Sequence, residues 1–320
     1  DRNPEPRSMR DGDGTLIGWG VAIGAYPGNA APAIAKLSAD TAGTIRVAVA
    51  GHEMGQGIRT AITLLVADDL GIQPTAVQVS VGDTRRVPQH LTAGSWGTAT
   101  ALPAVHAALR ELRTQLGLPQ TGPVDLRAAV AATGAPRVDA EATTMAQGQP
   151  AQAAVDRLRK GLPAMAGPEY PGFVTFSYIA HFAEVRVEPT TCRIRVPRVV
   201  SVADCGRVAS PVTAASQVRG GVIWGIGAAL REQSLVDARY GGFLNSTMEE
   251  YPIAVNADIH QIDVDFIDEP DPLLNPVGVK GLGEVAMVGV SAAIGNAVYH
   301  ATGTRFRRLP IHIEDVLASL

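Results

Sequence analysis

The sequence predicts an α+β protein of two similar halves, each a β-hairpin followed by helices that begin at glycine-rich loops. A hairpin pattern over residues 34–49 precedes helical periodicity, and the same order recurs from residue 183. The 320 residues, 46% of them hydrophobic and 18% charged, can bury enough core for two domains. We therefore expect a first subdomain at residues 1–165 and a second at 166–320.

The first half opens with two predicted strands within residues 34–49, joined by the turn Asp40-Thr41-Ala42-Gly43. The loop Gly51-His52-Glu53-Met54-Gly55-Gln56-Gly57 comes next. After it, apolar residues recur at helical spacing from Ile58, and Gly71 provides a stop signal. The glycines of this loop therefore lie at the start of a helix.

A further strand is predicted at residues 77–81, and the loop Gly94-Ser95-Trp96-Gly97-Thr98 then begins a second helix that ends at Gly117. Between residues 121 and 171 the content of Ala, Gly, Pro and Gln rises, and one short helix at residues 153–161 is the only element predicted. We interpret residues 121–171 as a variable insertion or interdomain segment.

The second half repeats the order, with a hairpin formed by residues 183–188 and 193–202. Asp204-Cys205-Gly206 follows, and Ser210-Pro211 favours a helix start, with Ser at the N-cap and Pro at the first helical position. On this helix Gly221, Gly225 and Ala229 are spaced four residues apart, so one face is almost without side chains and another backbone can approach it.

The chain then returns to a strand at residues 259–266 and a proline-rich loop at 268–276. The loop Gly278-Val279-Lys280-Gly281-Leu282-Gly283-Glu284 is predicted to lead directly into one long helix that Gly303 closes. Its apolar face contains Met287, Val290, Ile294 and Val298.

Charge and composition exclude several classes of function. The net charge of −4, without a basic block, argues against nucleic acid and anionic membranes as partners. The most apolar run, Val218–Leu230, is interrupted by glycines and too short to span a bilayer. Cys192 and Cys205 alone cannot ligate an iron–sulfur cluster, and the seven scattered histidines do not suggest a protein-ligated metal. Any metal should arrive inside a cofactor.

Glycine-rich loops at helix starts are suited to binding anions, because the first N–H groups of a helix are unpaired and its N-terminus is partly positive. Several such loops suggest a large anionic ligand held mainly by backbone groups. For any single loop, ordinary turn chemistry is the more common explanation of the glycines. The dinucleotide pattern GxGxxG and the P-loop are absent.

The chain opens at Asp1 without an initiator Met. Five motifs occur along it in a characteristic order. They are Gly51–Gly57 with Thr60, Gly94-Ser95, Asp204-Cys205-Gly206 with Pro211 and Gln217–Gly221, Lys280–Glu284, and Ala293–Gly303. Together they resemble the C-terminal half of the large, molybdopterin-binding subunit of the xanthine dehydrogenase/aldehyde oxidase family, and the opening residues favour its bacterial aldehyde dehydrogenase branch. We expect an excised or processed piece of such a subunit.

The resemblance implies that Glu284 is the catalytic base beside molybdenum, which the pterin holds without a protein ligand. The positions that it assigns to cofactor binding are Met54, Gly55, Gln56, Gly57, Gly94, Ser95, Trp96, Gly97, Thr98, Gln217, Gly281 and Gly283. Bacterial members generally use the molybdopterin cytosine dinucleotide. Two positions depart from the pattern of the family that the chain resembles. Ser210 stands where that family usually has Asn, and Cys192 stands where its hairpin turn usually has Gly.

The implied function is hydroxylation of an aldehyde or an N-heterocycle with water as the oxygen source. The implied partners are a chain with the N-terminal half of the molybdenum subunit, an iron–sulfur subunit with [2Fe–2S] centres, and an FAD subunit. Two alternatives stay open: a carbon monoxide dehydrogenase-type subunit, and a non-catalytic module that carries the cofactor. The sequence leaves the substrate, the electron acceptor and the compartment, cytoplasm or periplasm, undecided.

Overall fold

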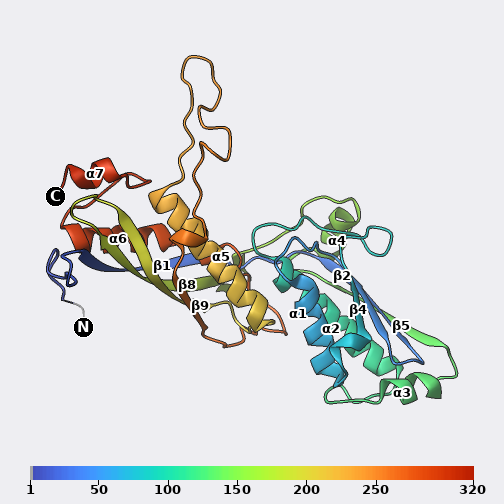
Figure 1. Ribbon diagram of the computed structural model, residues 1–320. Helices are drawn as coiled ribbons and strands as arrows, with labels where there is room; N and C mark the ends of the chain where they lie inside the picture. Colours follow the sequence, from blue (N-terminus) through green and yellow to red (C-terminus); the bar gives the residue numbers. More distant parts are fainter. Residues whose placement is uncertain (1–2) are drawn as a thin grey trace.

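The computed structural model describes residues 3–320 and contains two four-stranded sheets, each covered by helices on one face (Figure 1). Residues 1 and 2, with which the chain opens, lie outside the described part. The predicted α+β class is confirmed. The two layered halves lie side by side along an elongated molecule, so the surface between them is available for a site.

The first sheet has the strand order β4-β3-β2-β5. Strands β2 (Ala33–Asp40) and β3 (Ile45–Val49) form the predicted hairpin, and β4 (Val77–Ser80) pairs with β3 in parallel. Helices α1 (Ile58–Leu70) and α2 (Gly97–Gln115) pack against this sheet around a core that includes Leu37, Ile62 and Leu109. Gly71 closes α1 in the left-handed conformation, as its position predicts.

The segment 121–171 is not merely an insertion. It contains α3 (Leu126–Ala132), β5 (Arg137–Thr144), α4 (Ala151–Arg159) and β6 (Glu169–Tyr170), and β7 (Phe173–Val174) follows directly after it. Strand β5 pairs with β2 and forms the edge of the first sheet. Its sequence does alternate apolar and polar residues, but two of its three apolar residues are alanines, which are weak strand formers, and the sequence analysis missed it.

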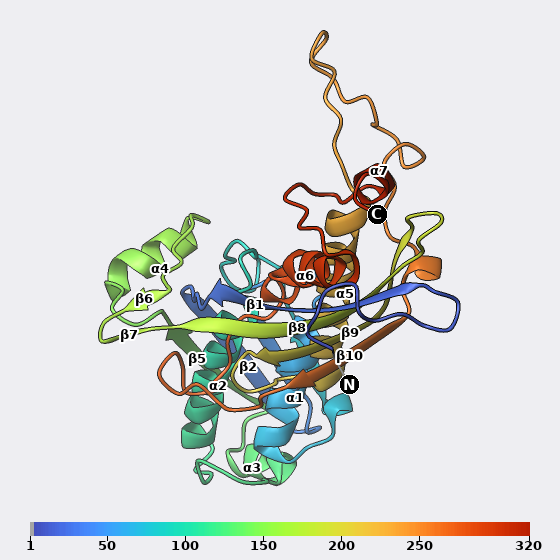
Figure 2. The same ribbon diagram turned by 90° about the vertical axis from the view of Figure 1, so that its left-hand side faces the viewer.

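The second sheet has the order β1-β8-β9-β10 (Figure 2). Strands β8 (Phe176–Val187) and β9 (Ile194–Asp204) form the predicted hairpin, and β10 (Gln261–Phe266) pairs with β9 in parallel. Strand β1 (Leu16–Pro27) pairs with β8 along its whole length. The division at residue 165 therefore does not follow the sheets, because the N-terminal strand belongs to the second one.

Helices α5 (Pro211–Leu230) and α6 (Val290–Thr302) cover one face of the second sheet. The predicted close approach along the glycine face of α5 is present. A Cβ at Gly221 would lie 2.6 Å from Ala286, and one at Gly225 would lie 2.4 Å from the Cβ of Val290. Larger side chains at these positions would separate α5 from the segment that follows Glu284.

The prediction of one long helix directly after Glu284 is wrong. Glu284 precedes a single 3₁₀ turn, η3 (Val285–Met287), and the chain breaks at Gly289, whose φ is 96°, before α6 begins. A Cβ added at Gly289 would lie only 3.2 Å from the backbone of Ile23 and Gly24 in β1. The glycine therefore allows the chain to pass close to this strand.

One stretch, Val285–Thr302, is long and apolar enough by composition to cross a membrane, but 56% of it is buried. Its helical part, α6, has 13 residues and packs against β1 and β8. It is thus a core helix of the second half. The remaining short elements are η1 (Pro74–Ala76), η2 (Asn256–Asp258) and α7 (Ile313–Leu317).

The two departures from the family pattern have different structural outcomes. Cys192 is buried in the β8–β9 turn with a φ of 56°, a conformation in which a side chain is strained. Ser210 occupies the N-cap of α5, but its hydroxyl accepts a hydrogen bond from Thr213 Oγ1 at 2.7 Å and does not cap a backbone N–H.

Candidate functional site

A cleft of about 300 Å³ lies where the two halves meet. Ten of the thirteen predicted site residues line it: Met54, Gln56, Gly57, Gly94, Ser95, Gly97, Thr98, Gln217, Gly283 and Glu284. They belong to the loops that precede helices in both halves of the molecule, and these loops are up to 230 residues apart in the sequence (284 − 54). The tertiary structure therefore gathers the loops that the sequence analysis singled out into one site.

The N-termini of α1, α2 and α5 all face this cleft, since residues at or next to each helix start line it. Within residues 3–320, no side chain caps the start of α2 or of α5. Their first N–H groups, including those of Gly97 and Thr98, are thus suited to an anionic ligand in the cleft.

The start of α1 is different, because a carboxylate of the protein already occupies it. Glu53 Oε1 accepts hydrogen bonds from the backbone N–H groups of Gly55 and Gly57, both at 3.0 Å, and Oε2 accepts one from Arg59 at 3.1 Å. Burial raises the pKa of Glu53, but these backbone hydrogen bonds outweigh it and lower the pKa below its ordinary value of 4.5. The α1 loop is therefore shaped by Glu53 and is not an open anion site.

We predict that Glu53→Gln lowers the free energy of unfolding by about 1 kcal/mol at pH 7, because it removes a charged cap. Since the folded-state pKa is lowered, this stabilisation is complete above the ordinary value of 4.5 and disappears as the pH falls through the folded-state pKa. Urea unfolding of both proteins from pH 7 to pH 3 measures the difference. The exposed Glu141→Gln is the control, and a difference that persists unchanged at pH 3 would contradict the prediction.

Gln56 and Gln217 lie on opposite sides of the cleft and are held differently. Gln56 is engaged within its own loop: its Oε1 accepts from Met54 N at 2.7 Å and its Nε2 donates to the carbonyl of His52 at 2.5 Å. Gln217, on α5, faces the Glu284 loop, and its Oε1 lies 3.1 Å from the position of a Cβ added at Gly283. Gln217 is thus the better placed of the two to contact a ligand.

Three predicted site residues do not line the cleft. A Cβ added at Gly55 would have no other atom within 4 Å, so this glycine faces open space. Trp96 is buried, and its indole Nε1 donates to the carbonyl of Leu91 at 2.9 Å, so it supports the loop from behind. A Cβ at Gly281 would lie 2.2 Å from the carbonyl oxygen of Ser95, and glycine here permits the two loops to touch.

Glu284 is half-buried at one end of the cleft and forms a two-way contact with Ser95. The backbone N–H of Glu284 donates to Ser95 Oγ at 2.8 Å, and Ser95 Oγ donates to Glu284 Oε2 at 3.1 Å. Ser95 itself has a φ of 59°, a left-handed conformation that aims its hydroxyl at this loop. The α2 loop of the first half thereby orients the carboxylate of the second half.

Tyr26, at the end of β1, is a site residue that the sequence analysis missed. Interaction of its phenol with the Glu284 carboxylate, followed by burial, raises the pKa of Tyr26 to about 12. The phenol therefore stays protonated at neutral pH and can donate to this carboxylate. Tyr26 belongs to none of the glycine-rich motifs, and only the pairing of β1 with β8 carries it to the site.

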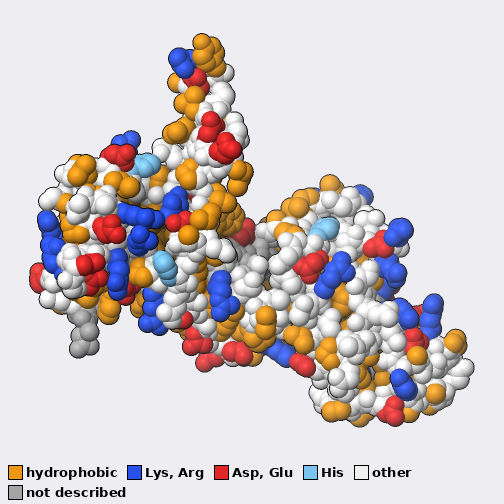
Figure 3. All heavy atoms as spheres, viewed as in Figure 1, with side chains coloured by type: hydrophobic (Ala, Val, Ile, Leu, Met, Phe, Trp, Pro, Cys, Tyr) orange, Lys and Arg blue, Asp and Glu red, His pale blue; other side chains and the backbone are white. Residues whose placement is uncertain are grey.

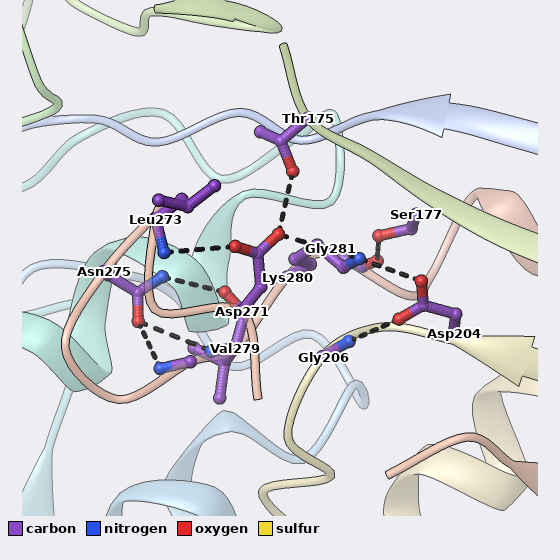
Figure 4. Close-up of polar contacts among 11 residues, drawn as sticks. Thr175, Ser177, Asp204, Gly206, Asp271, Leu273, Asn275, Val279, Lys280 and Gly281 are labelled. Carbon is purple, nitrogen blue, oxygen red and sulfur yellow. Dashed lines mark hydrogen bonds and ion pairs between the residues drawn. The ribbon is translucent and has the colours of Figure 1, made fainter. Parts of the chain in front are cut away.

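A buried lysine fixes the loop that carries Glu284 (Figure 4). Lys280 is 8% exposed, and its Nζ lies 3.0 Å from Asp204 Oδ2 and 3.8 Å from Asp271 Oδ2. The other oxygen of Asp204 accepts from Gly206 N at 3.0 Å. Asn275 closes the loop by donating to the carbonyl of Val279 at 2.8 Å and accepting from Gly278 N at 3.0 Å. The ion pair thus joins the end of β9 to the loop.

The cleft lacks the ligands of a protein-bound metal. In the part of the chain from residue 3 onward, no group of three or more His, Cys, Asp or Glu side chains could hold an ion. Burial, followed by the charge of Asp204, raises the pKa of the Cys205 thiol to about 12, so it is not a thiolate at neutral pH. A metal at this site would have to be carried by a larger ligand.

Comparison with known proteins gives three findings. The family described as "Molybdopterin cofactor-binding domain" matches residues 1–260. The aldehyde oxidoreductase molybdenum-binding subunit of Escherichia coli (strain K12) is 34% identical over 319 residues, which cover 100% of this chain and 43% of that protein. A putative xanthine dehydrogenase molybdenum-binding subunit of the same strain is 29% identical, over 92% of this chain and 41% of that protein.

Among solved structures, carbon monoxide dehydrogenase from Oligotropha carboxidovorans has the same fold, with a TM-score of 0.75 at 19% identity. The match covers 95% of this chain and 40% of that one. This chain therefore spans less than half the length of the relatives it matches.

Proposed function

Because this chain belongs to the molybdopterin cofactor-binding domain family, we propose that it forms one side of the cofactor site in a molybdenum hydroxylase, with Glu284 as the catalytic base. The proposed reaction is the oxidative hydroxylation of an aldehyde or an N-heterocycle, with water as the source of oxygen. The relatives named as aldehyde oxidoreductase and xanthine dehydrogenase subunits support this class of substrate. The observation that carries the proposal is the meeting of the cofactor-binding loops with Glu284 in one cleft.

The donors in the cleft fit a phosphate-bearing pterin. The open starts of α2 and α5 offer backbone N–H groups, and Arg207, exposed in the same cleft, supplies a positive charge. Gln217 adds an amide that can both donate and accept. Gly97, Gly94 and Gly283 leave space for a ligand to approach the backbone.

When bound, the molybdenum cofactor supplies the two-electron oxidation, and the residues of this chain manage the proton and the positions. Glu284 accepts a proton from the oxygen that adds to the substrate carbon. Ser95 donates to one oxygen of this carboxylate, and the protonated Tyr26 interacts with the same group, so both side chains help to orient it. The Lys280 ion pairs keep the loop beneath it from moving.

Finer features of the complex are part of the proposal. We expect the cytosine dinucleotide form of the cofactor, which the several open helix starts can accommodate along one cleft. We also expect partner chains that carry the rest of the molybdenum subunit, [2Fe–2S] centres and FAD. Relatives that are themselves subunits of enzyme complexes support the existence of partner chains.

The proposal is tested by metal and nucleotide analysis of the purified complex. Molybdenum and CMP released on acid treatment, each near one equivalent per chain, are the expected result. Gln217→Ala should reduce both severalfold, because it removes a side-chain contact to the cofactor. Ser216→Ala, its exposed neighbour on α5, should leave them unchanged. Full molybdenum and CMP content in Gln217→Ala would exclude Gln217 from the cofactor site, and a complex without molybdenum would refute the proposed function.

A further inference from the structure

Residues 233–255 form a long arm that stands clear of the rest of the molecule (Figures 1 and 3). The arm begins just after the end of α5 and returns to the body at η2. The structure describes all residues of the arm, and none of them belongs to a helix or a β-strand. The family motifs do not include it, and the proposed site does not use it.

The arm is held in shape by its own polar contacts. At its base, Asn245 Oδ1 accepts from Leu235 N at 2.8 Å, and Asn245 Nδ2 donates to the carbonyl of Gln233 at 2.5 Å. Further out, Leu244 N donates to the carbonyl of Leu235 at 2.7 Å, and Arg239 pairs with Asp237 at 3.1 Å near the turn. These contacts fix a hairpin path that leaves the apolar side chains outside.

The arm presents an apolar surface to solvent. Eight of its large hydrophobic side chains are between 42% and 84% exposed: Leu235, Val236, Tyr240, Phe243, Leu244, Met248, Ile253 and Val255. None of the eight belongs to a hydrophobic core within residues 3–320. Burial of such side chains in a core is stabilising, so their exposure on an extended segment indicates a surface for a partner.

The helix that leads to the arm presents one more exposed apolar side chain, at the cofactor cleft. Trp224, on α5, lines the cleft and is 60% exposed. The end of α5 at Leu230 is roughly 10 Å further along the helix axis, and the arm begins there. A partner that covers the arm and Trp224 together would therefore also cover one side of the cleft.

We propose that the arm is the docking surface for the portion of the molybdenum subunit that these 320 residues do not span, and that this docking closes the cleft. The chain covers 43% and 41% of its two curated relatives, so more than half of each subunit lies outside the match and is available for this contact. Both halves of this chain line the cleft, but Trp224 at its side is exposed to solvent. A partner that covers Trp224 would exclude water from a cofactor bound in the cleft. This inference rests on the proposed function for the identity of the partner.

A photo-crosslinking residue, benzoylphenylalanine, tests the contact when it replaces Tyr240 in the purified complete complex. The expected result is a crosslink, mapped by mass spectrometry, to the portion of the molybdenum subunit outside these residues. Leu309, which is 54% exposed but lies off the arm, is the control position and should not give that crosslink. Crosslinks only to a second copy of this chain or to an iron–sulfur or FAD subunit, or none at all, would overturn the proposal.

A paired substitution separates docking from folding. Phe243→Asp with Leu244→Asp should lower the yield of the Tyr240 crosslink by about tenfold, because hot-spot contacts of interfaces are apolar and desolvated. The unfolding temperature of the chain should stay unchanged, since neither side chain is in a core. Leu309→Asp should preserve the yield, and a yield preserved in the arm variant would also overturn the proposal. Molybdenum content, measured in the same preparations, separates failure of the docking contact from failure of the proposed function. A complex that gives the crosslink but contains no molybdenum would refute the proposed function and would leave the docking contact supported.

Discussion

Glu284→Gln is expected to lower turnover of the assembled enzyme by a factor on the order of 10² to 10⁴, the range that a general base contributes. Glutamine keeps the size of the side chain, and its amide oxygen can still accept from Ser95, whose hydroxyl lies 3.1 Å from the Glu284 carboxylate. It cannot accept the proton, because an amide oxygen is only very weakly basic. The loss should therefore fall on the rate of the chemical step.

The measurement is turnover per molybdenum atom, with aldehydes and N-heterocycles as substrates. Molybdenum content should match that of the wild type, because the backbone contact between Glu284 N and Ser95 Oγ at 2.8 Å does not depend on the carboxylate. Glu53→Gln, in the same cleft region but engaged in capping α1, is the matched control and should retain turnover. Near-wild-type turnover in fully loaded Glu284→Gln would place the base elsewhere and would favour a module that only carries the cofactor.

Lys280→Met is expected to lower the free energy of unfolding by about 3 kcal/mol, the lower end for breaking a buried ion pair. Methionine matches the length of lysine but leaves Asp204 and Asp271 facing each other without a cation. Their side chains are 29% and 21% exposed, so water compensates only in part. Because Lys280 also anchors the loop before Glu284, turnover should fall together with stability.

Equilibrium urea unfolding provides the measurement, and Lys36→Met provides the control. Lys36 and Glu141 form an ion pair at 3.3 Å, but their side chains are 50% and 51% exposed, and such pairs contribute about 1 kcal/mol or less. If both lysine variants lose the same stability, the Lys280 network does not hold the loop as we describe.

Local chemistry determined much of this protein. The two hairpins, the starts of α1 and α2 after glycine-rich loops and the stop at Gly71 were predicted because alternation, helical spacing and left-handed glycines act over a few residues. The same holds for the glycine face of α5, since the spacing of Gly221 and Gly225 alone places both on one side. The candidate site, with Glu284 and its loops, was predictable because each loop carries a recognisable motif.

Other features depend on contacts between residues far apart in the sequence. Strand β1 joins the second sheet and brings Tyr26 to Glu284, although the two are 258 positions apart (284 − 26). Strand β5 carries its alternation on small residues, Ala140 and Ala142, and its pairing with β2 makes it part of the sheet. No local pattern encodes such pairings, because a strand's partner is decided by which edges the packed halves leave free.

The tertiary structure also decided which helix starts remain open to a ligand. The sequence singled out the loops Gly51–Gly57, Gly94–Thr98 and Gly278–Glu284 as helix starts suited to anions without ranking them, and it placed Ser210 at the N-cap of α5. Glu53 folds back and satisfies the N–H groups at the start of α1, whereas α2 and α5 have no side-chain cap within residues 3–320. The sequence by itself thus determined where helices begin, and only the folded chain determined which beginnings are free, because a hydrogen-bond donor can be occupied by any acceptor that the fold brings within reach.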